Sequence, residues 1–131
     1  MGSFSAVNPN RVPPYNDEHL ALDFDQQSAL LDGRRMQLTR KEYDLFALLV
    51  QHAGEIIPRD ALLMQVWGYG ADIRTRTLDV HVRRLRKKLG QYADEYIETI
   101  FGIGYRFQPF HAARYFRPTI ASNAPAVAVG A

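Results

Sequence analysis

Hydrophobic residues recur at helical spacing most clearly between residues 74 and 89, which read RTRTLDVHVRRLRKKL. Leu78, Val82, Leu85 and Leu89 occupy positions i, i+4, i+7 and i+11, so they form one apolar stripe on an α-helix. The pattern predicts an amphipathic helix over about residues 75–89 that turns this stripe toward a core. Its opposite side carries Arg76, Thr77, Val80, Arg83, Arg84 and Lys87, with His81 and Lys88 on one flank and Asp79 and Arg86 on the other.

Two further helices are predicted before this one. Thr39 and Glu42 have the spacing of a capping box, and the apolar residues that follow favour a helix ending near Gly54. After a short extended piece, Pro58 suits the first position of a second helix. Its apolar face comprises Leu62, Leu63, Val66 and Trp67. Residues 68–74 form a loop that joins the second helix to the third.

Alternating apolar residues on both sides of the helical region predict strands. The first set is Leu20, Leu22, Phe24, Ala29, Leu31, Met36 and Leu38, interrupted by Asp32-Gly33, a strong hairpin signal. It predicts three short antiparallel strands, with room for a fourth from the preceding arm. Residues 96–101 and 105–107 are also rich in strand formers, and Gly102-Ile103-Gly104 between them predicts a terminal hairpin.

The order of these elements predicts an α+β fold, a winged helix-turn-helix with an N-terminal antiparallel β-sheet, three helices and a C-terminal β-hairpin wing. Residues 1–18 contain Pro and Asn without periodicity and are interpreted as a flexible arm or linker. Residues 19–108 form the expected domain, and residues 109–131 are interpreted as a weakly structured, Ala- and Pro-rich tail. A chain of 131 residues has room for one such domain.

The charge distribution indicates what the polar side of the third helix faces. Residues 74–88 contain seven basic side chains and one acid, a net charge of +6, whereas the rest of the chain carries −4. A solvated helix usually mixes charges of both signs, and this one does not. Concentrated positive charge on one helix is typical of a protein that binds nucleic acid.

Other classes of function are disfavoured by the composition. The chain has no cysteine, no apolar run long enough for a membrane span and no leader resembling a signal peptide, which favours a cytoplasmic protein. Histidines 19, 52, 81 and 111 are scattered, and no HExxH motif or Gly-rich phosphate loop occurs. We therefore expect no catalytic residues, no metal site and no cofactor.

Three stretches carry a resemblance to a known family. LTRKEYDLFALLVQHAGEIIPRDALLMQVWG, RTRTLDVHVRRLRKKL and IETIFGIGYRF resemble, in order and spacing, the DNA-binding effector domain of OmpR/PhoB-type two-component response regulators. The resemblance implies an output domain that binds double-stranded promoter DNA as a head-to-tail homodimer on direct repeats. It also implies that the loop Gly68, Tyr69, Gly70, Ala71, Asp72 and Ile73 faces RNA polymerase.

The resemblance also assigns roles on the third helix. It places Arg76, His81, Arg83 and Arg86 at phosphate-contacting positions, to which Lys87 on the same face is added, and Thr77, Val80 and Arg84 at the floor of the major groove. Arg84 has the reach and the planar fork to bind guanine O6 and N7, and Val80 is small enough to meet a thymine methyl group. Asp79 is expected to orient a neighbouring arginine or a wing group, since it would repel phosphate.

The chain departs from the family pattern in the wing, assigned to Phe101, Gly102, Gly104 and Arg106. The family commonly has an arginine before the Gly-x-Gly turn, where it reaches the minor groove, and Phe101 stands there instead. Arg106 or Arg11 could substitute for that arginine, while Phe101 either packs or presses on a sugar or another protomer. Residues 1–18 are also too short to hold a receiver domain, so a sensor kinase would act only through a domain absent from this chain.

Alternatives to an effector domain remain open at this level. The chain could be an excised domain or a stand-alone winged-helix regulator, an RNA-binding protein, or a protein-interaction module that has lost DNA binding. Binding to duplex phosphate should weaken steeply with salt, whereas apolar docking should not.

Overall fold

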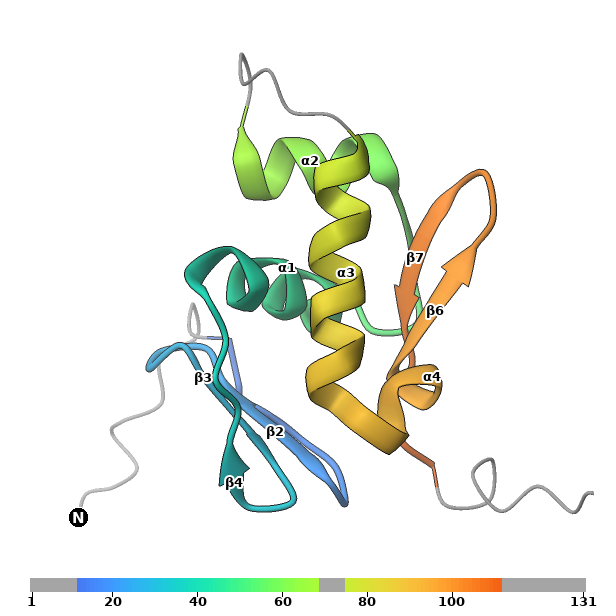
Figure 1. The fold of residues 1–131 in the computed structure, drawn as a ribbon. Coiled ribbons are helices and arrows are strands. Elements are labelled where there is room, and N and C mark those ends of the chain that lie inside the picture. The colour runs from blue at the N-terminus through green and yellow to red at the C-terminus, as the bar shows by residue number, and fades with distance from the viewer. Residues whose placement is uncertain (1–11, 69–74, 112–131) are drawn as a thin grey trace, which may run out of the picture.

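The computed structural model of the protein describes residues 12–68 and 75–111. Its N-terminal part is a four-stranded antiparallel sheet, in which the strands lie in chain order (Figure 1). The strands are β1 (Tyr15–Asn16), β2 (Leu20–Asp23), β3 (Ser28–Leu31) and β4 (Arg34–Arg35). The three predicted strands correspond to β2, β3 and β4, and β1 is the fourth, but β4 ends before Met36 and Leu38, which lie outside the strand.

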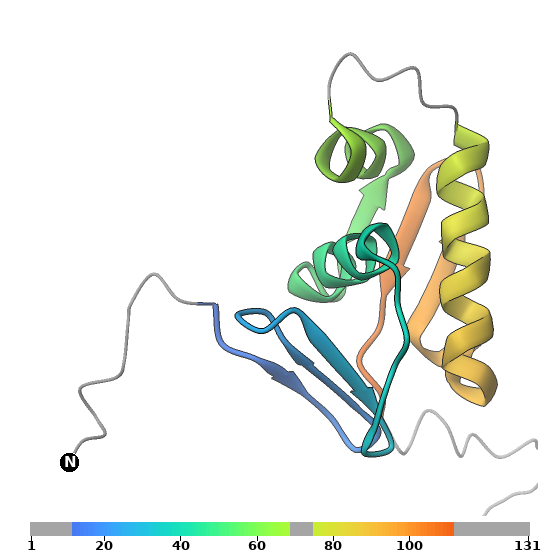
Figure 2. The same ribbon diagram turned by 60° about the vertical axis from the view of Figure 1, so that its left-hand side comes forward.

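Three helices follow, namely α1 (Arg40–Gln51), α2 (Arg59–Trp67) and α3 (Thr75–Leu89). A second sheet consists of β5 (Ile56–Pro58), which precedes α2, and the hairpin β6 (Ile97–Ile100) and β7 (Gly104–Phe107), in the order β5-β7-β6. In Figure 2, α1 and α2 lie on one side of α3, and the N-terminal sheet lies below α1. The predicted fold, a winged helix-turn-helix with an N-terminal sheet, is confirmed.

Two local predictions differ from the structure. Pro58 is the residue before α2 rather than its first residue, because it pairs with Gly104 as the last residue of β5. Tyr96, predicted as the first residue of the terminal hairpin, instead ends the one-turn helix α4 (Ala93–Tyr96), which follows the 3₁₀ turn η2 (Gly90–Tyr92) after α3. Tyr92 and Tyr96 are buried there, and their packing accounts for the helical turns.

The sheet and the hairpin are joined by residues beyond the expected domain limits of 19 and 108. Asp17 Oδ1 accepts hydrogen bonds from the Tyr96 hydroxyl and from the backbone of Leu20, and Asp17 Oδ2 accepts one from the backbone of Phe110. Phe110 itself is buried in the core. The described fold therefore extends beyond the expected limits at both ends. The remaining parts of the predicted arm and tail, residues 1–11 and 112–131, lie outside the described residues.

The core is built where the helices meet the two sheets. Phe107 of β7 is fully buried and packs against three aromatic rings, with centroid distances of 5.4 Å to Tyr15, 6.1 Å to Phe46 and 5.5 Å to Tyr96. These partners come from β1, α1 and α4, so one side chain connects the N-terminal sheet to the wing. Burial of the apolar surface of these rings is the main contribution to stability here.

The predicted capping box at the start of α1 is confirmed. The Thr39 hydroxyl accepts a hydrogen bond from the backbone of Glu42 at 3.2 Å, and Glu42 Oε1 accepts one from the backbone of Thr39 at 3.0 Å. Glu42 is 1% exposed and also pairs with Lys88 Nζ of α3 at 2.6 Å. Burial raises the pKa of the Glu42 carboxyl, but the hydrogen bonds from Lys88 and Thr39 outweigh it and leave the pKa lowered. The cap therefore also holds α1 against α3.

Replacing Glu42 with glutamine should lower the free energy of unfolding at pH 7 by about 1–3 kcal/mol, because the charged hydrogen bond to Lys88 is lost. A carboxyl whose pKa is lowered by folding stabilises the protein above its unfolded pKa, and this contribution disappears as the pH falls through the folded pKa. The difference between the two proteins in urea unfolding should therefore shrink between pH 7 and about pH 3. Glu55→Gln, at an exposed position, is the control. An equal deficit at both pH values would contradict the role of the charge.

Candidate nucleic-acid interface

The buried side of α3 agrees with the predicted stripe. Leu78, Val82, Leu85 and Leu89 are each 0–1% exposed and pack in the core, where α3 contacts both α1 and α2. Since these four positions define one side of the helix, the opposite side is fixed toward solvent.

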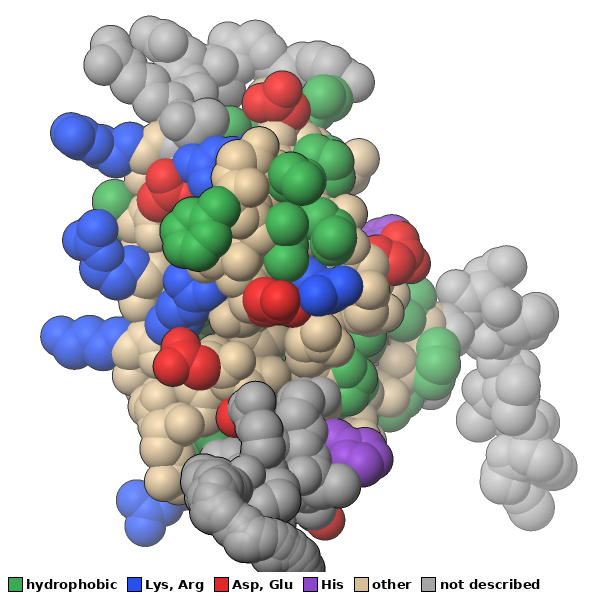
Figure 3. All heavy atoms as spheres, turned by 90° about the vertical axis from the view of Figure 1, so that its right-hand side faces the viewer, with side chains coloured by type: hydrophobic (Ala, Val, Ile, Leu, Met, Phe, Trp, Pro, Cys, Tyr) green, Lys and Arg blue, Asp and Glu red, His purple; other side chains and the backbone are tan. Residues whose placement is uncertain are grey.

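That outward side carries exposed positive charge. Arg76, Arg83, Arg84 and Lys87 are exposed, and Thr77 and Val80 between them are half-buried. Lys and Arg side chains project from the left edge of the molecule in Figure 3, and this edge is the face turned toward the viewer in Figure 1, where α3 lies in front. The structure thus brings six of the eight predicted contact residues on this helix to one face.

Asp79, the acidic residue of α3, is drawn away from this face. Its carboxylate accepts hydrogen bonds from Arg59 Nη2 at 2.6 Å and from the Tyr105 hydroxyl at 2.7 Å. The Arg59 hydrogen bond, followed by that of Tyr105, holds the pKa of Asp79 below its usual value despite partial burial. The predicted role of Asp79 is confirmed, because it orients an arginine of α2 and also a tyrosine of the wing.

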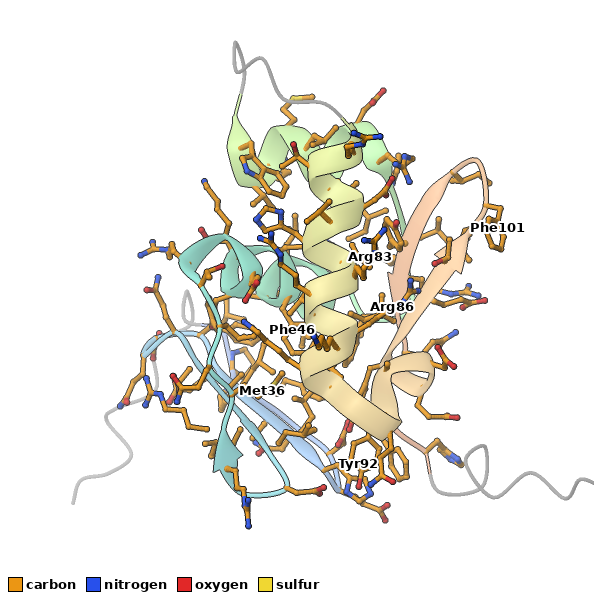
Figure 4. All side chains as sticks on the ribbon, viewed as in Figure 1. Met36, Phe46, Arg83, Arg86, Tyr92 and Phe101 are labelled. Carbon is orange, nitrogen blue, oxygen red and sulfur yellow. The ribbon has the colours of Figure 1, made fainter. Side chains whose placement is uncertain are left out.

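Arg86 differs from the exposed arginines of α3. Its guanidinium donates hydrogen bonds to the Ile97 carbonyl at 2.9 Å and the Thr99 hydroxyl at 2.7 Å, both on β6. It also lies 5.8 Å from the centre of the Tyr105 ring, which Arg59 approaches to 5.9 Å. Figure 4 shows Arg86 extending from α3 toward the hairpin. Arg86 therefore fixes the wing to α3, and its predicted phosphate contact stays a prediction.

His81 and Lys88 lie on the other flank of α3 and are also engaged. His81 Nδ1 is 2.8 Å from the Thr77 carbonyl, and its ring meets Trp67 edge to face at 5.0 Å. Lys88 is paired with Glu42. The predicted phosphate contact of His81 stays a prediction. It would have to be made by Nε2, because Nδ1 lies against the Thr77 carbonyl.

The wing presents an apolar tip. Phe101 is 89% exposed and Ile103 is 51% exposed, at the turn that joins β6 and β7. Gly102 between them has φ 77°, a left-handed conformation that glycine adopts without strain. Arg106 is bound to Glu98 at 2.7 Å, so its guanidinium already has a carboxylate partner. Arg11, the other substitute considered for a wing arginine, lies outside the described residues.

Gly104 is required by close packing rather than by the turn. A Cβ atom at this position would lie 2.0 Å from the Ile57 carbonyl oxygen of β5. The adjacent backbone is also paired, since Arg59 N donates to the Ile103 carbonyl at 3.0 Å. The absence of a side chain at Gly104 thus lets β5 support the wing.

The loop predicted to face RNA polymerase is described only at its start. Gly68 ends α2 with φ 96° and donates its backbone N–H to Met64 at 2.9 Å. The other predicted residues, Tyr69, Gly70, Ala71, Asp72 and Ile73, lie outside the described residues.

Sequence reasoning missed Arg59 and Tyr105, which hold Asp79 and brace the wing. Arg59 follows Pro58 at a helix start and Tyr105 lies in a predicted strand, but no local spacing pairs either with Asp79. Within residues 12–68 and 75–111, no group of three or more His, Asp or Glu side chains is placed to hold a metal ion. No helix in that part of the chain is long and apolar enough to cross a membrane.

A basic third helix braced against a β-hairpin defines this protein as a winged helix-turn-helix domain. Residues 33–107 match the family described as "Transcriptional regulatory protein, C terminal", so the chain belongs to that family. The resemblance to OmpR/PhoB-type effector domains is thereby confirmed.

Related proteins agree with this assignment. The chain is 38% identical over 87 residues to the response regulator ArlR of Staphylococcus saprophyticus, covering 66% of this chain and 40% of the relative. It is also 38% identical over 94 residues to the transcriptional regulatory protein SrrA of Staphylococcus aureus, covering 70% and 39%. The chain thus spans about two fifths of the length of these curated relatives.

Solved structures show the same fold. The Thermotoga maritima response regulator DrrB, an OmpR/PhoB homologue, matches with a TM-score of 0.67 and 30% identity, covering 72% of this chain and 44% of that one. The Klebsiella pneumoniae RstA DNA-binding domain, solved in complex with the RstA box, matches with a TM-score of 0.66 and 35% identity, covering 74% and 98%.

Replacing Gly104 with alanine should destabilise the domain by about 3 kcal/mol or more, because the new methyl group overlaps the β5 backbone, and this loss should exceed that of a glycine replaced at the turn. Gly102→Ala is the matched control, since a Cβ there meets open space and only the left-handed backbone is penalised, at roughly 1–2 kcal/mol. Urea unfolding would measure both, and amide hydrogen exchange would report whether β5 has separated from β7. Equal stability of the two variants would show that the close approach of the strands is unimportant.

Proposed function

We propose that this domain binds double-stranded promoter DNA in a sequence-specific manner and thereby regulates transcription, with α3 as the recognition helix in the major groove. The observation that supports this most directly is the outward face of α3, where Arg76, Arg83, Arg84 and Lys87 are exposed. Asp79 is held by Arg59 and Tyr105, so its charge is compensated within the protein. A positively charged face of this kind attracts the phosphates of a DNA duplex.

Within this interface, Arg84 is proposed to read a guanine, with Thr77 and Val80 on the floor of the groove. Arg76, Arg83 and Lys87 lie exposed on the same helix and are proposed to contact phosphates. Arg86 and His81 are proposed as additional phosphate contacts, but each already makes a hydrogen bond within the protein. Phosphate contacts position the helix, whereas contacts to base edges select the sequence.

The relatives support a wider role, which is also a proposal. They are described as response regulators, and the RstA domain was solved with its DNA box. We infer that this chain serves as the output domain of a two-component response regulator in the cytoplasm. It would bind as a head-to-tail homodimer on direct repeats, contact RNA polymerase through residues 68–73, and receive a sensor kinase signal only through a receiver domain.

The direct test is selection of binding sites from random duplex DNA at near-physiological salt. The expected result is a direct repeat whose half-sites lie about one helical turn apart. Binding to the winning site should be several orders of magnitude tighter than to a scrambled duplex. If the selection enriches no sequence, the proposed specificity is refuted. If the affinity for DNA does not fall with salt, the charged face is not binding phosphates, and a protein-interaction module is favoured instead.

Arg84→Ala should weaken binding to the selected site by about 1–3 kcal/mol and relax the preference at one base pair, because a bidentate contact is lost. Arg84→Lys is the control, since it keeps the charge but not the planar fork. Titration of site variants with a fluorescent duplex measures both effects. An alanine variant with the parent's base preference at every position would remove Arg84 from base readout.

Arg83→Ala should weaken binding to selected and scrambled DNA alike and should reduce the slope of log K against log salt by about one, because one phosphate contact disappears. Arg83→Lys should keep the parent's slope. Affinity measured between roughly 50 and 200 mM salt provides the comparison. A loss confined to the selected site would instead make Arg83 a base-reading residue.

A further inference from the structure

The wing tip carries an aromatic side chain that the protein leaves almost entirely in water. Phe101 is 89% exposed, the highest value among the large hydrophobic residues found exposed in the described part of the chain, and Ile103 on the same turn is 51% exposed. Two apolar side chains at one turn are too few for a stable protein interface, which buries about 800 Å² on each partner. They are sufficient to enter a narrow groove.

The tip is rigidly supported. Ile103 N donates to the Ile100 carbonyl at 2.9 Å, which closes the turn, and Arg59 N donates to the Ile103 carbonyl at 3.0 Å, which fastens the turn to the start of α2. Gly104 packs directly on the β5 backbone. Phe101 is therefore presented on a braced turn, and little conformational freedom remains to be lost when it makes a contact.

The position of the tip relative to the basic face is also fixed. Arg86 joins α3 to Ile97 and Thr99 of β6, and the Tyr105 hydroxyl joins β7 to Asp79 of α3. In Figure 4, Arg83 extends from α3 toward the hairpin, and Phe101 projects from the outer edge of that hairpin, to one side of α3. A duplex whose major groove holds α3 would run its backbone past the wing and bring the neighbouring minor groove to the tip.

We propose that Phe101 acts as an apolar wedge, which enters the minor groove beside the α3 contact, packs on deoxyribose and partly unstacks one base step. This inference rests on the proposed DNA binding. A phenyl ring has no charge with which to read the electrostatic potential of the groove, so it acts through packing and bending. Flexible pyrimidine–purine steps deform most easily, so Phe101 selects such a step in the flanking sequence without a hydrogen bond to any base.

The test uses the 131-residue chain and a duplex with one selected half-site, to which only one protomer binds. Phe101→Ala should lower affinity for this duplex roughly tenfold, because apolar contact with the sugars is lost. It should also reduce the bend measured by energy transfer between dyes at the duplex ends, and quench the signal of 2-aminopurine at the flanking step. The salt slope should be unchanged, because no charge is removed. Phe101→Leu should retain the bend, and Leu30→Ala, an exposed residue of β3, should change nothing.

Several outcomes would overturn the wedge. Unchanged affinity and bend in Phe101→Ala would show that the ring stays in water. A loss seen only on the direct repeat would mean that Phe101 packs against a second copy of the chain. A parent protein that binds no duplex at all would refute the proposed function itself, a result distinct from normal binding by the Phe101 variant.

Discussion

The structure depends on burial of the apolar stripe of α3. Leu78, Val82, Leu85 and Leu89 lie against α1 and α2, and each is essentially inaccessible to water. Full burial of a leucine or valine side chain contributes about 1.5–3 kcal/mol to the free energy of unfolding. Rotating this helix would expose four such side chains and remove a large part of the stability of a typical domain. The orientation of the basic face is therefore a consequence of core packing. The basic side chains face outward because they lie on the side of α3 opposite the buried stripe.

The two flanks of α3 convert this orientation into a fixed geometry. On one flank, Asp79 and Arg86 hold the wing, and on the other, Lys88 reaches the cap of α1 through Glu42. The charged residues of one helix thus fall into two groups. Those on the flanks have partners within the protein, whereas Arg76, Arg83, Arg84 and Lys87 face outward and are exposed. A preorganised face of this kind loses less entropy on binding than a flexible one.

The sequence predicted what depends on local spacing. The α3 stripe and the Thr39–Glu42 capping box follow from residues a few positions apart, and the structure confirms both. The sequence placed Arg83 on the outward side of the helix and Arg86 on its flank, but it could not give them different roles, because the partners of Arg86 lie on the distant β6 strand. The requirement for Gly104 likewise comes from Ile57, far away in the chain. The sequence predicted that Asp79 orients an arginine or a wing group, but only the fold identified its partners as Arg59 and Tyr105. Roles in DNA contact came from family resemblance.

The role of α3 as the recognition helix is tested most directly by an NMR titration of the protein with its selected duplex, in which side-chain guanidinium signals are followed. We expect the signals of Arg83 and Arg84 to shift on binding and to return when salt is added, while amide signals of the N-terminal sheet around Leu30 remain in place. Shifts concentrated on the N-terminal sheet, with the α3 arginines unaffected, would show that α3 is not the DNA-binding helix.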